Sequence, residues 1–222
     1  MGQEPIFKNT PRIALFVDYL PKDEWDAVKT YCENNENNFE FVGHNPEIGW
    51  KKKTHSINSE IKFQTSFLPT QEEIDSGGYM TNGDNYKISM HIPADEQVNK
   101  ILLWMLINVR DTIKTNYGNK TYFESGPWLS MAKEGDNMGL HCDGVFLDKV
   151  GAVTDFSCVY YVNDEYEGGE LYMPILGLSI KPKANSLLIW SHTWHEDMAH
   201  GVKPIVSGTR YMSQGFFTTV EA

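Results

Sequence analysis

The C-terminal half of this chain consists of short, closely spaced segments of β-type composition, and this pattern limits the folds that it can adopt. Glycine and proline punctuate these segments from about Tyr122 onwards. Many short strands with such spacing are typical of a β-sandwich or a jelly roll. The expected strands are Trp128–Ala132, Leu140–Asp143, Phe156–Val162, Gly169–Met173, Leu178–Lys181, Ser186–Trp190 and Arg210–Thr218.

The N-terminal half predicts one strand and two helices. Residues 12–20 are strongly apolar and predict a strand. Pro21-Lys22-Asp23 then opens a helix that runs to about Asn35, with Asp23 as the expected N-cap. A second helix is predicted from Pro93 until Tyr117-Gly118 stops it.

The second predicted helix has an unusually wide apolar surface. Leu103, Trp104 and Ile107 extend its apolar stripe, so we expect burial on more than one side and packing against a sheet. The stripe itself repeats at helical spacing through Val98, Ile101, Leu102, Met105, Val109 and Ile113.

Residues 39–92 give weaker signals. A short strand is expected at 39–43, a half-buried strand at 61–67 from its alternation, and another strand at 86–92. Gly77-Gly78 and Asn82-Gly83 are turn signals. The segment suits loops that border a site, and it suits plain surface connections equally well.

Composition narrows the classes of function. The formal net charge of −11 makes nucleic acid a poor partner, and Lys51-Lys52-Lys53 is the only basic run. The longest apolar run, 101–107, has seven residues, too few to span a bilayer. No secretory signal is seen. The three cysteines form an odd, sparse set, which indicates a reducing compartment and hence a cytoplasmic location.

The sequence His141-Cys142-Asp143 is a candidate metal-binding pair. An imidazole and a carboxylate two residues apart are two of the three ligands of a 2-His-1-carboxylate site for non-haem iron. The same spacing occurs in His195-Glu196-Asp197. Cys142 is expected to be a small buried side chain that points away from the metal. The second imidazole has three candidates, His192, His195 and His200.

Arg210 begins the last predicted strand. Alternation places Arg210, Met212, Gln214 and Phe216 on one face of that strand and Tyr211, Ser213 and Phe217 on the other. A buried guanidinium is costly unless it is paired. Its partner is either a bound anion, which it would grip in a bidentate manner, or an Asp or Glu elsewhere in the fold.

These features, taken in order, resemble the prolyl-4-hydroxylase-like branch of the Fe(II)/2-oxoglutarate-dependent oxygenases. The resemblance implies an α+β, mainly β fold with a double-stranded β-helix (jelly-roll) core and supporting N-terminal helices. It also implies one dioxygenase domain over 1–222, with helical support in 1–120 and the metal site in 121–222. The matching segments are His141-x-Asp143, Tyr160–Asp164, Glu167–Leu171, Lys181-Pro182, His200–Val206 and Gly208–Tyr211.

The resemblance also implies roles for individual residues. His141, Asp143 and His200 would bind Fe(II), and Arg210 would bind the distal carboxylate of 2-oxoglutarate, assisted by Tyr161. The expected reaction uses O2, with ascorbate as a candidate reductant, and releases succinate and CO2 while hydroxylating an unactivated C–H bond. The expected substrate is peptidyl proline or another amino-acid residue of a protein or peptide. A free amino acid, a small metabolite and a non-catalytic ligand-binding module are the alternatives, and the oligomeric state is not readable.

Some residues differ from the pattern of this branch, and others distinguish between the reactions that its relatives catalyse. Residues 131–135 lack a tyrosine that members of this branch often carry before the metal-binding pair. Phe216 stands where alkylation-repair relatives have a second arginine, which argues against nucleobase repair. Asp143 favours hydroxylation over halogenation. Tyr160 is expected to point away from the site, and His192 and His195 are expected in a loop or at its rim.

Overall fold

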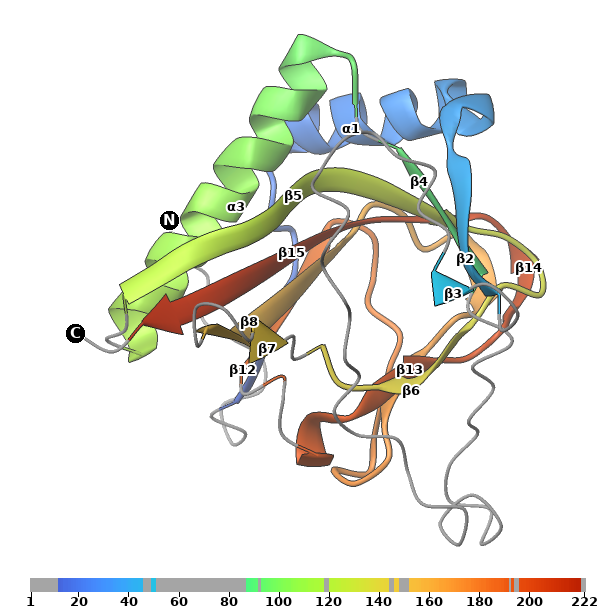
Figure 1. Ribbon diagram of the computed structural model, residues 1–222. Coiled ribbons are helices and arrows are strands. Elements are labelled where there is room, and N and C mark those ends of the chain that lie inside the picture. The colour runs from blue at the N-terminus through green and yellow to red at the C-terminus, as the bar shows by residue number, and fades with distance from the viewer. Residues whose placement is uncertain are drawn as a thin grey trace, which may run out of the picture.

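Two antiparallel sheets lie one over the other in the computed structural model, and two helices cover the outer face of the larger sheet (Figure 1). The structure describes residues 12–45, 49–50, 87–91, 93–117, 120–143, 146–147, 152–191, 193 and 196–220. This arrangement confirms the predicted mainly β, jelly-roll type of fold with helical support.

The larger sheet is built around two long paired strands, one from the middle of the chain and one from its C-terminal end. Arg210 pairs with Ala132, and the pairing continues to Val220 and Lys120. In spatial order the strands are β1 (Ile13–Phe16), β12 (Ser186–Ser191), β8 (Ala152–Tyr161), β15 (Arg210–Val220), β5 (Lys120–Ala132), β4 (Lys87–His91), β2 (Glu40–Asn45) and β3 (Gly49–Trp50), with β7 (Phe146–Leu147) beside β8.

The smaller sheet lies on the face of the large sheet that is turned away from the helices (Figure 1). Its spatial order is β11 (Leu178–Ile180), β10 (Leu171–Met173), β13 (His200–Val202) and β6 (Met138–His141). A separate two-stranded ribbon joins β14 (Ile205–Gly208) to β9 (Tyr166–Gly168). Short 3₁₀ turns occupy Glu36–Asn38 and Glu196–Met198.

The first helix, α1 (Lys22–Asn34), begins two residues earlier than an N-cap at Asp23 would allow. Pro21 occupies the N-cap position and no side chain caps the helix, so the prediction for Asp23 is wrong. Asp23 instead lies in the first turn, where its charge complements the helix dipole. Proline favours this start because its fixed φ suits the helix boundary.

The second helix, α3 (Glu96–Tyr117), confirms the predicted span and stripe. The Val98 N–H donates a hydrogen bond to the Asp95 carboxylate, 2.9 Å away, which caps the helix start. Every residue of the predicted stripe is buried: Val98, Ile101, Leu102, Met105, Val109 and Ile113.

The prediction that α3 is buried on more than one side is wrong. The Leu103 side chain is 45% exposed and that of Trp104 is 62% exposed. Ile107 is half-buried. A single sheet covers this helix, so apolar residues that face away from the sheet meet water.

The three layers, helices, large sheet and small sheet, enclose two apolar cores. The first lies between the helices and the large sheet, and the second lies between the two sheets. Tyr160 belongs to the first core and Tyr161 to the second, because neighbouring residues of β8 point to opposite faces.

The expected strands are present, with shifted ends. β5 and β8 begin earlier than predicted, and the strands expected at 39–43 and 86–92 correspond to β2 and β4. The strand at 61–67 and the two turn signals lie outside the described residues. Among the helices that the structure describes, none has the length and apolarity needed to cross a bilayer.

Candidate active site

Three predicted ligands meet between the two sheets. His141 ends β6, His200 begins β13, and the two residues are direct partners across this strand pair. Asp143 follows β6 by two residues. One ligand atom from each side chain lies within 4.8 Å of the other two, and no other such group occurs among the described residues.

The carboxylate of Asp143 lies between the two imidazoles. Its Oδ1 is 3.2 Å from His141 Nε2, and its Oδ2 is 3.5 Å from His200 Nε2. The Nδ1 atoms point the other way: that of His141 is 2.8 Å from the Gly139 carbonyl, and that of His200 is 3.1 Å from the Met198 carbonyl. A carbonyl can only accept, so each Nδ1 carries the proton and each Nε2 presents a lone pair to the shared space.

Packing fixes the orientation of the rings. The ring centroids of His141 and His200 are 4.4 Å apart, and the Trp190 ring meets His200 edge-on at 4.9 Å. His200 is only 3% exposed. The imidazoles are therefore held in place before any ion binds.

The local electrostatics favour an ionised Asp143 and a neutral His200, which are the protonation states that a metal needs. Burial opposes a charge on Asp143, but His200 and His141 outweigh it and lower the pKa of Asp143 to about 2. Burial lowers the pKa of His200 to about 4, against the attraction of Asp143. The pKa of His141 is raised, because its contact with Asp143 outweighs its burial. An ionised carboxylate beside a neutral imidazole is the form that binds a divalent cation.

Arg210 lies deep in the same space and is 3% exposed. Its Nη1 donates to the Gly169 carbonyl at 2.9 Å, while its Nε is buried without a hydrogen-bond partner. It forms no ion pair with any described residue, so the described part of the chain does not supply the acidic partner considered above. A buried guanidinium with unused donors suits a bound carboxylate.

Local backbone contacts hold Arg210 in this position. The Asn163 side chain accepts a hydrogen bond from the Tyr211 N–H and donates one to the Thr209 carbonyl, both at 2.8 Å. Gly169 has a φ of +69°, and a Cβ there would lie 3.4 Å from Arg210 Nη1 and 2.5 Å from a methyl group of Ile205. A glycine is therefore needed for the close approach of its carbonyl to the guanidinium.

Two tyrosines surround the guanidinium. Arg210 acts electrostatically on both Tyr161 and Tyr166, although burial still raises the pKa of each phenol. The Tyr166 hydroxyl is buried without a hydrogen-bond partner. The Tyr161 side chain makes no hydrogen bond with another described residue. Tyr161 lines the same pocket as Arg210, so its phenol is available to a ligand that Arg210 binds.

One pocket connects the histidine–aspartate cluster to Arg210. Its wall on β15 confirms the predicted alternation, because Arg210, Met212, Gln214 and Phe216 all line it. The other lining residues are Met138, His141, Asp143, Ser157, Cys158, Val159, Tyr161, Leu171, Trp190, His200 and Val202.

The competing histidine–aspartate pair is not assembled by the described structure. Asp197 forms an ion pair with Arg12, with 2.5 Å between Oδ2 and Nη2. His192 and His195 lie outside the described residues. Cys142 does not line the pocket, as predicted, but it is half-buried and the prediction of a buried side chain is wrong.

Sequence reasoning missed several residues of the site. Tyr166, Trp190 and Ser157 carry no motif. Pairing with Gly208 brings Tyr166 near Arg210, and the register of β8 and β12 brings Ser157 and Trp190 into the pocket. Asn163 lay within a matching segment, but its role in bracketing Arg210 depends on a contact across 46 residues.

Comparison with known families agrees with this geometry. Residues 127–218 match the model of the 2OG-Fe(II) oxygenase superfamily. The matched segment of this chain is therefore a 2OG-Fe(II) oxygenase domain. The matched residues of the oxygenase include the three clustered side chains and Arg210. No curated protein matches the sequence.

Solved structures show the same fold at low sequence identity. A Pseudomonas putida prolyl-4-hydroxylase is 16% identical with a TM-score of 0.61, over 96% of this chain and 95% of that one. A Trichoplax adhaerens prolyl hydroxylase, in complex with a hypoxia-inducible-factor peptide fragment, is 15% identical with a TM-score of 0.59, over 96% and 86%. A viral collagen prolyl hydroxylase from Paramecium Bursaria Chlorella virus-1, solved with 2-oxoglutarate, is 16% identical with a TM-score of 0.58, over 95% and 97%.

The oxygenase is thus a 2-oxoglutarate-dependent dioxygenase that uses Fe(II), 2-oxoglutarate and O2, as its family requires. The described residues fit these groups. Two oriented Nε2 lone pairs and a carboxylate are a donor set for Fe(II). The unpartnered Nε of Arg210 and hydroxyl of Tyr166 suit the free carboxylate of the co-substrate.

Proposed function

We propose that His141, Asp143 and His200 bind Fe(II) and that Arg210, with Tyr161, binds the distal carboxylate of 2-oxoglutarate. One observation carries this proposal: a preorganised His-Asp-His cluster shares a pocket with a buried arginine that has no acidic partner among the described residues. A buried charge of this kind is costly unless a ligand pairs with it.

When bound, the iron and its co-substrate supply an oxidation in which O2 and 2-oxoglutarate become succinate and CO2 and a substrate C–H becomes C–OH. The protein contributes orientation and shielding. Gly139 and Met198 fix the imidazole tautomers through their carbonyls. Trp190 and Met212 form apolar walls that limit water around the ligands.

For the substrate, we propose an amino-acid residue of a protein or peptide, with peptidyl proline first. The Trichoplax relative binds a peptide fragment, and three relatives named above are prolyl hydroxylases. The pocket wall on β15 places an amide, Gln214, beside the aromatic ring of Phe216, which meets the Trp128 ring at a tilt of 50° with 6.3 Å between centroids. An aromatic wall beside an amide suits an aliphatic ring next to a peptide carbonyl.

We also propose that the enzyme works in a reducing, cytoplasmic setting. Cys32 and Cys158 are buried thiols and Cys142 is not in a disulfide. Burial raises the pKa of both Cys32 and Cys158 to about 12, which keeps these thiols unreactive.

The decisive experiment measures succinate release with Fe(II), 2-oxoglutarate and O2 across proline-containing peptides, free amino acids and small metabolites. Each peptide is paired with a version that has alanine in place of proline, and hydroxylation is read by mass spectrometry. We expect stimulation by proline-containing peptides and loss of it in the alanine versions. Stimulation by free amino acids or metabolites alone would refute the substrate class while leaving the metal site intact.

A further inference from the structure

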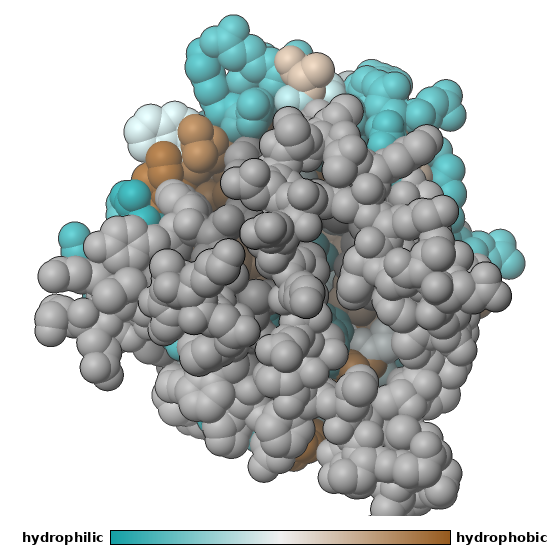
Figure 2. Space-filling model, viewed as in Figure 1, coloured by the Kyte–Doolittle hydropathy of each residue, from teal (hydrophilic) through white to brown (hydrophobic). Residues whose placement is uncertain are grey.

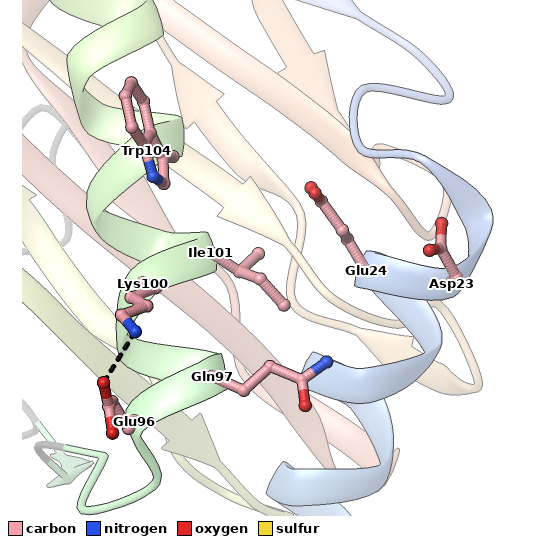
Figure 3. Close-up of a pocket in the computed structure, with 7 residues that line it drawn as sticks. All are labelled: Asp23, Glu24, Glu96, Gln97, Lys100, Ile101 and Trp104. Atoms are coloured by element: carbon pink, nitrogen blue, oxygen red, sulfur yellow. Dashed lines mark hydrogen bonds and ion pairs between the residues drawn. The ribbon is translucent and has the colours of Figure 1, made fainter.

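A groove separates the first turn of α1 from the first turns of α3 (Figure 3). Its volume is about 540 Å³. It lies on the helical layer, whereas the candidate active site lies between the sheets on the other side of the large sheet (Figure 1). The groove therefore belongs to a surface that the oxygenase reaction does not use.

One wall of the groove exposes apolar side chains. Trp104 lines it and is 62% exposed, while Ile101, one turn earlier, forms part of its inner surface (Figure 3). Leu103, next to Trp104, is 45% exposed but does not line the groove. Brown and pale atoms gather over α3 at the upper left of Figure 2. Exposed indole and aliphatic side chains rimmed by polar groups are typical of interaction sites.

The rest of the groove is acidic. Asp23 and Glu24 come from α1, and neither forms an ion pair with any residue that the structure describes. Glu96 is paired at 2.6 Å with Lys100, which is the single cation among the lining residues. Carboxylates in first turns complement helix dipoles, which explains their placement but not the exposed tryptophan beside them.

We propose that this groove binds a segment of a partner protein that carries lysine or arginine next to an aliphatic residue. A guanidinium or ammonium group placed over the Trp104 ring gains a cation–π contact. The same cation can pair with Glu24, which extends from α1 toward α3 in Figure 3, and Asp23 adds a second negative charge to the α1 side of the groove. The aliphatic residue covers Ile101.

Charge favours this occupant over others. The whole chain has a net charge of −11, so a basic segment is attracted over a long range, whereas nucleic acid and a second copy of the chain are repelled. This proposal does not depend on the identity of the oxygenase substrate.

The test measures binding of a fluorescein-labelled peptide that repeats Arg-Leu-Gly, by fluorescence anisotropy with the full chain at low and high salt. The comparison peptide repeats Glu-Leu-Gly and has the same apolar content. We expect only the arginine peptide to bind, with affinity that falls as salt rises. The Trp104→Ala variant and the Asp23→Asn/Glu24→Gln variant should each weaken binding about tenfold.

Matched controls separate this groove from general surface effects. Leu103→Ala removes a neighbouring exposed apolar side chain outside the groove, and Asp26→Asn/Glu33→Gln removes the same charge elsewhere on α1. Both should bind the peptide normally. Lys100→Gln should bind it more tightly, because Glu96 loses its competing cation. Circular dichroism checks folding, and turnover of 2-oxoglutarate should be unchanged in every groove variant.

Three outcomes would overturn the proposal. The first is no binding of the arginine peptide up to about 1 mM. The second is equal binding of the glutamate peptide, or equal losses in the groove variants and their controls. The third is concentration-dependent dimerisation in sedimentation experiments that Trp104→Ala abolishes, since a second copy of the chain would then be the occupant.

Discussion

Both faces of the large sheet bury apolar and aromatic side chains, but they differ in how the buried polar groups are paired. On the face toward the helices, buried hydroxyls are satisfied: Tyr160 donates to the Asn185 side chain at 2.9 Å, and Tyr211 donates to Glu36. On the face toward the small sheet, buried polar atoms without a partner gather. They belong to Trp128, Ser130, Ser157, Ser186, Trp190 and Arg210.

Strand register explains why these atoms share one face. Trp128 is paired with Gln214, Ser130 with Met212 and Ser186 with Tyr161. Directly paired residues of antiparallel strands project to the same side, here the side of the pocket. Unsatisfied buried groups are costly, and three of these residues, Ser157, Trp190 and Arg210, line the pocket that holds the His-Asp-His cluster. This placement indicates a surface arranged for ligands rather than for stability. The buried hydroxyls of Tyr160 and Tyr211 on the helix-facing side are paired instead.

The largest effect should come from the ligand-facing side. Asp143→Ala removes the only carboxylate of the cluster. We expect it to abolish Fe(II)-dependent succinate formation and Fe(II) binding, while the thermal unfolding of the metal-free protein shows an intact fold. Normal turnover in this variant would refute the metal site.

The next largest effect should come from the helix-facing side, and it should be purely structural. Phe217 is fully buried in the core between helices and sheet. Phe217→Ala should lower the free energy of unfolding by about 3–5 kcal/mol, because the cavity cannot collapse fully. The KM for 2-oxoglutarate should stay unchanged below the unfolding transition. As a control, Val206→Ala, at an exposed position, should change stability by about 0.5 kcal/mol or less.

Arg210→Ala tests whether the ligand-facing side sacrifices stability for binding. The KM for 2-oxoglutarate should rise at least about tenfold, as expected when a charged contact worth about 1.5–3 kcal/mol is lost. Stability without ligand should be unchanged or higher, because an unpaired buried charge disappears. Lys203→Ala, which removes an exposed cation nearby, is the matched control. An unchanged KM in Arg210→Ala would show that Arg210 does not bind the carboxylate of 2-oxoglutarate.

Most of the correct predictions about these two faces came from the periodicity of apolar and polar residues. Alternation along β15 assigned Arg210, Gln214 and Phe216 to the pocket, and the helical stripe assigned the buried side of α3. Both are local properties, because a side chain's direction follows from its position in a regular element. The three clustered ligands were reached through resemblance and spacing, and their assignment as ligands remains a proposal.

What failed or was missed depends on contacts between distant segments. The exposure of Leu103 and Trp104 follows from what packs on α3, which no helical pattern encodes. The pairing of Asp197 with Arg12 joins residues 185 positions apart. Tyr166 reaches Arg210 only because Gly169 and its neighbours fold back in the β9–β10 turn region. Such contacts are set by topology rather than by local propensity.

The smallest expected effect gives the sharpest comparison, because it uses adjacent residues with the same chemistry. Tyr160 and Tyr161 are both fully buried on β8 and point to opposite faces. Tyr160→Phe loses the hydrogen bond to Asn185, whose side chain also binds both backbone groups of Leu20. We expect a loss of about 0.5–1.5 kcal/mol in stability, or about 2–4 °C in Tm for each kcal/mol, with no change in KM.

Tyr161→Phe should show the reverse. Its hydroxyl makes no hydrogen bond with another described residue, so removing it should leave the Tm unchanged. The same hydroxyl is assigned to the carboxylate held by Arg210, so the KM for 2-oxoglutarate should rise several-fold, by about 1 kcal/mol of binding. Each variant removes one hydroxyl oxygen from one face of the sheet. Measuring Tm and KM for both variants therefore distinguishes the structural role of one face from the binding role of the other. If Tyr161→Phe lowers the Tm and leaves the KM unchanged, Tyr161 supports the fold, and Arg210 must bind the co-substrate with another partner, for which the unpaired Tyr166 hydroxyl is the next candidate.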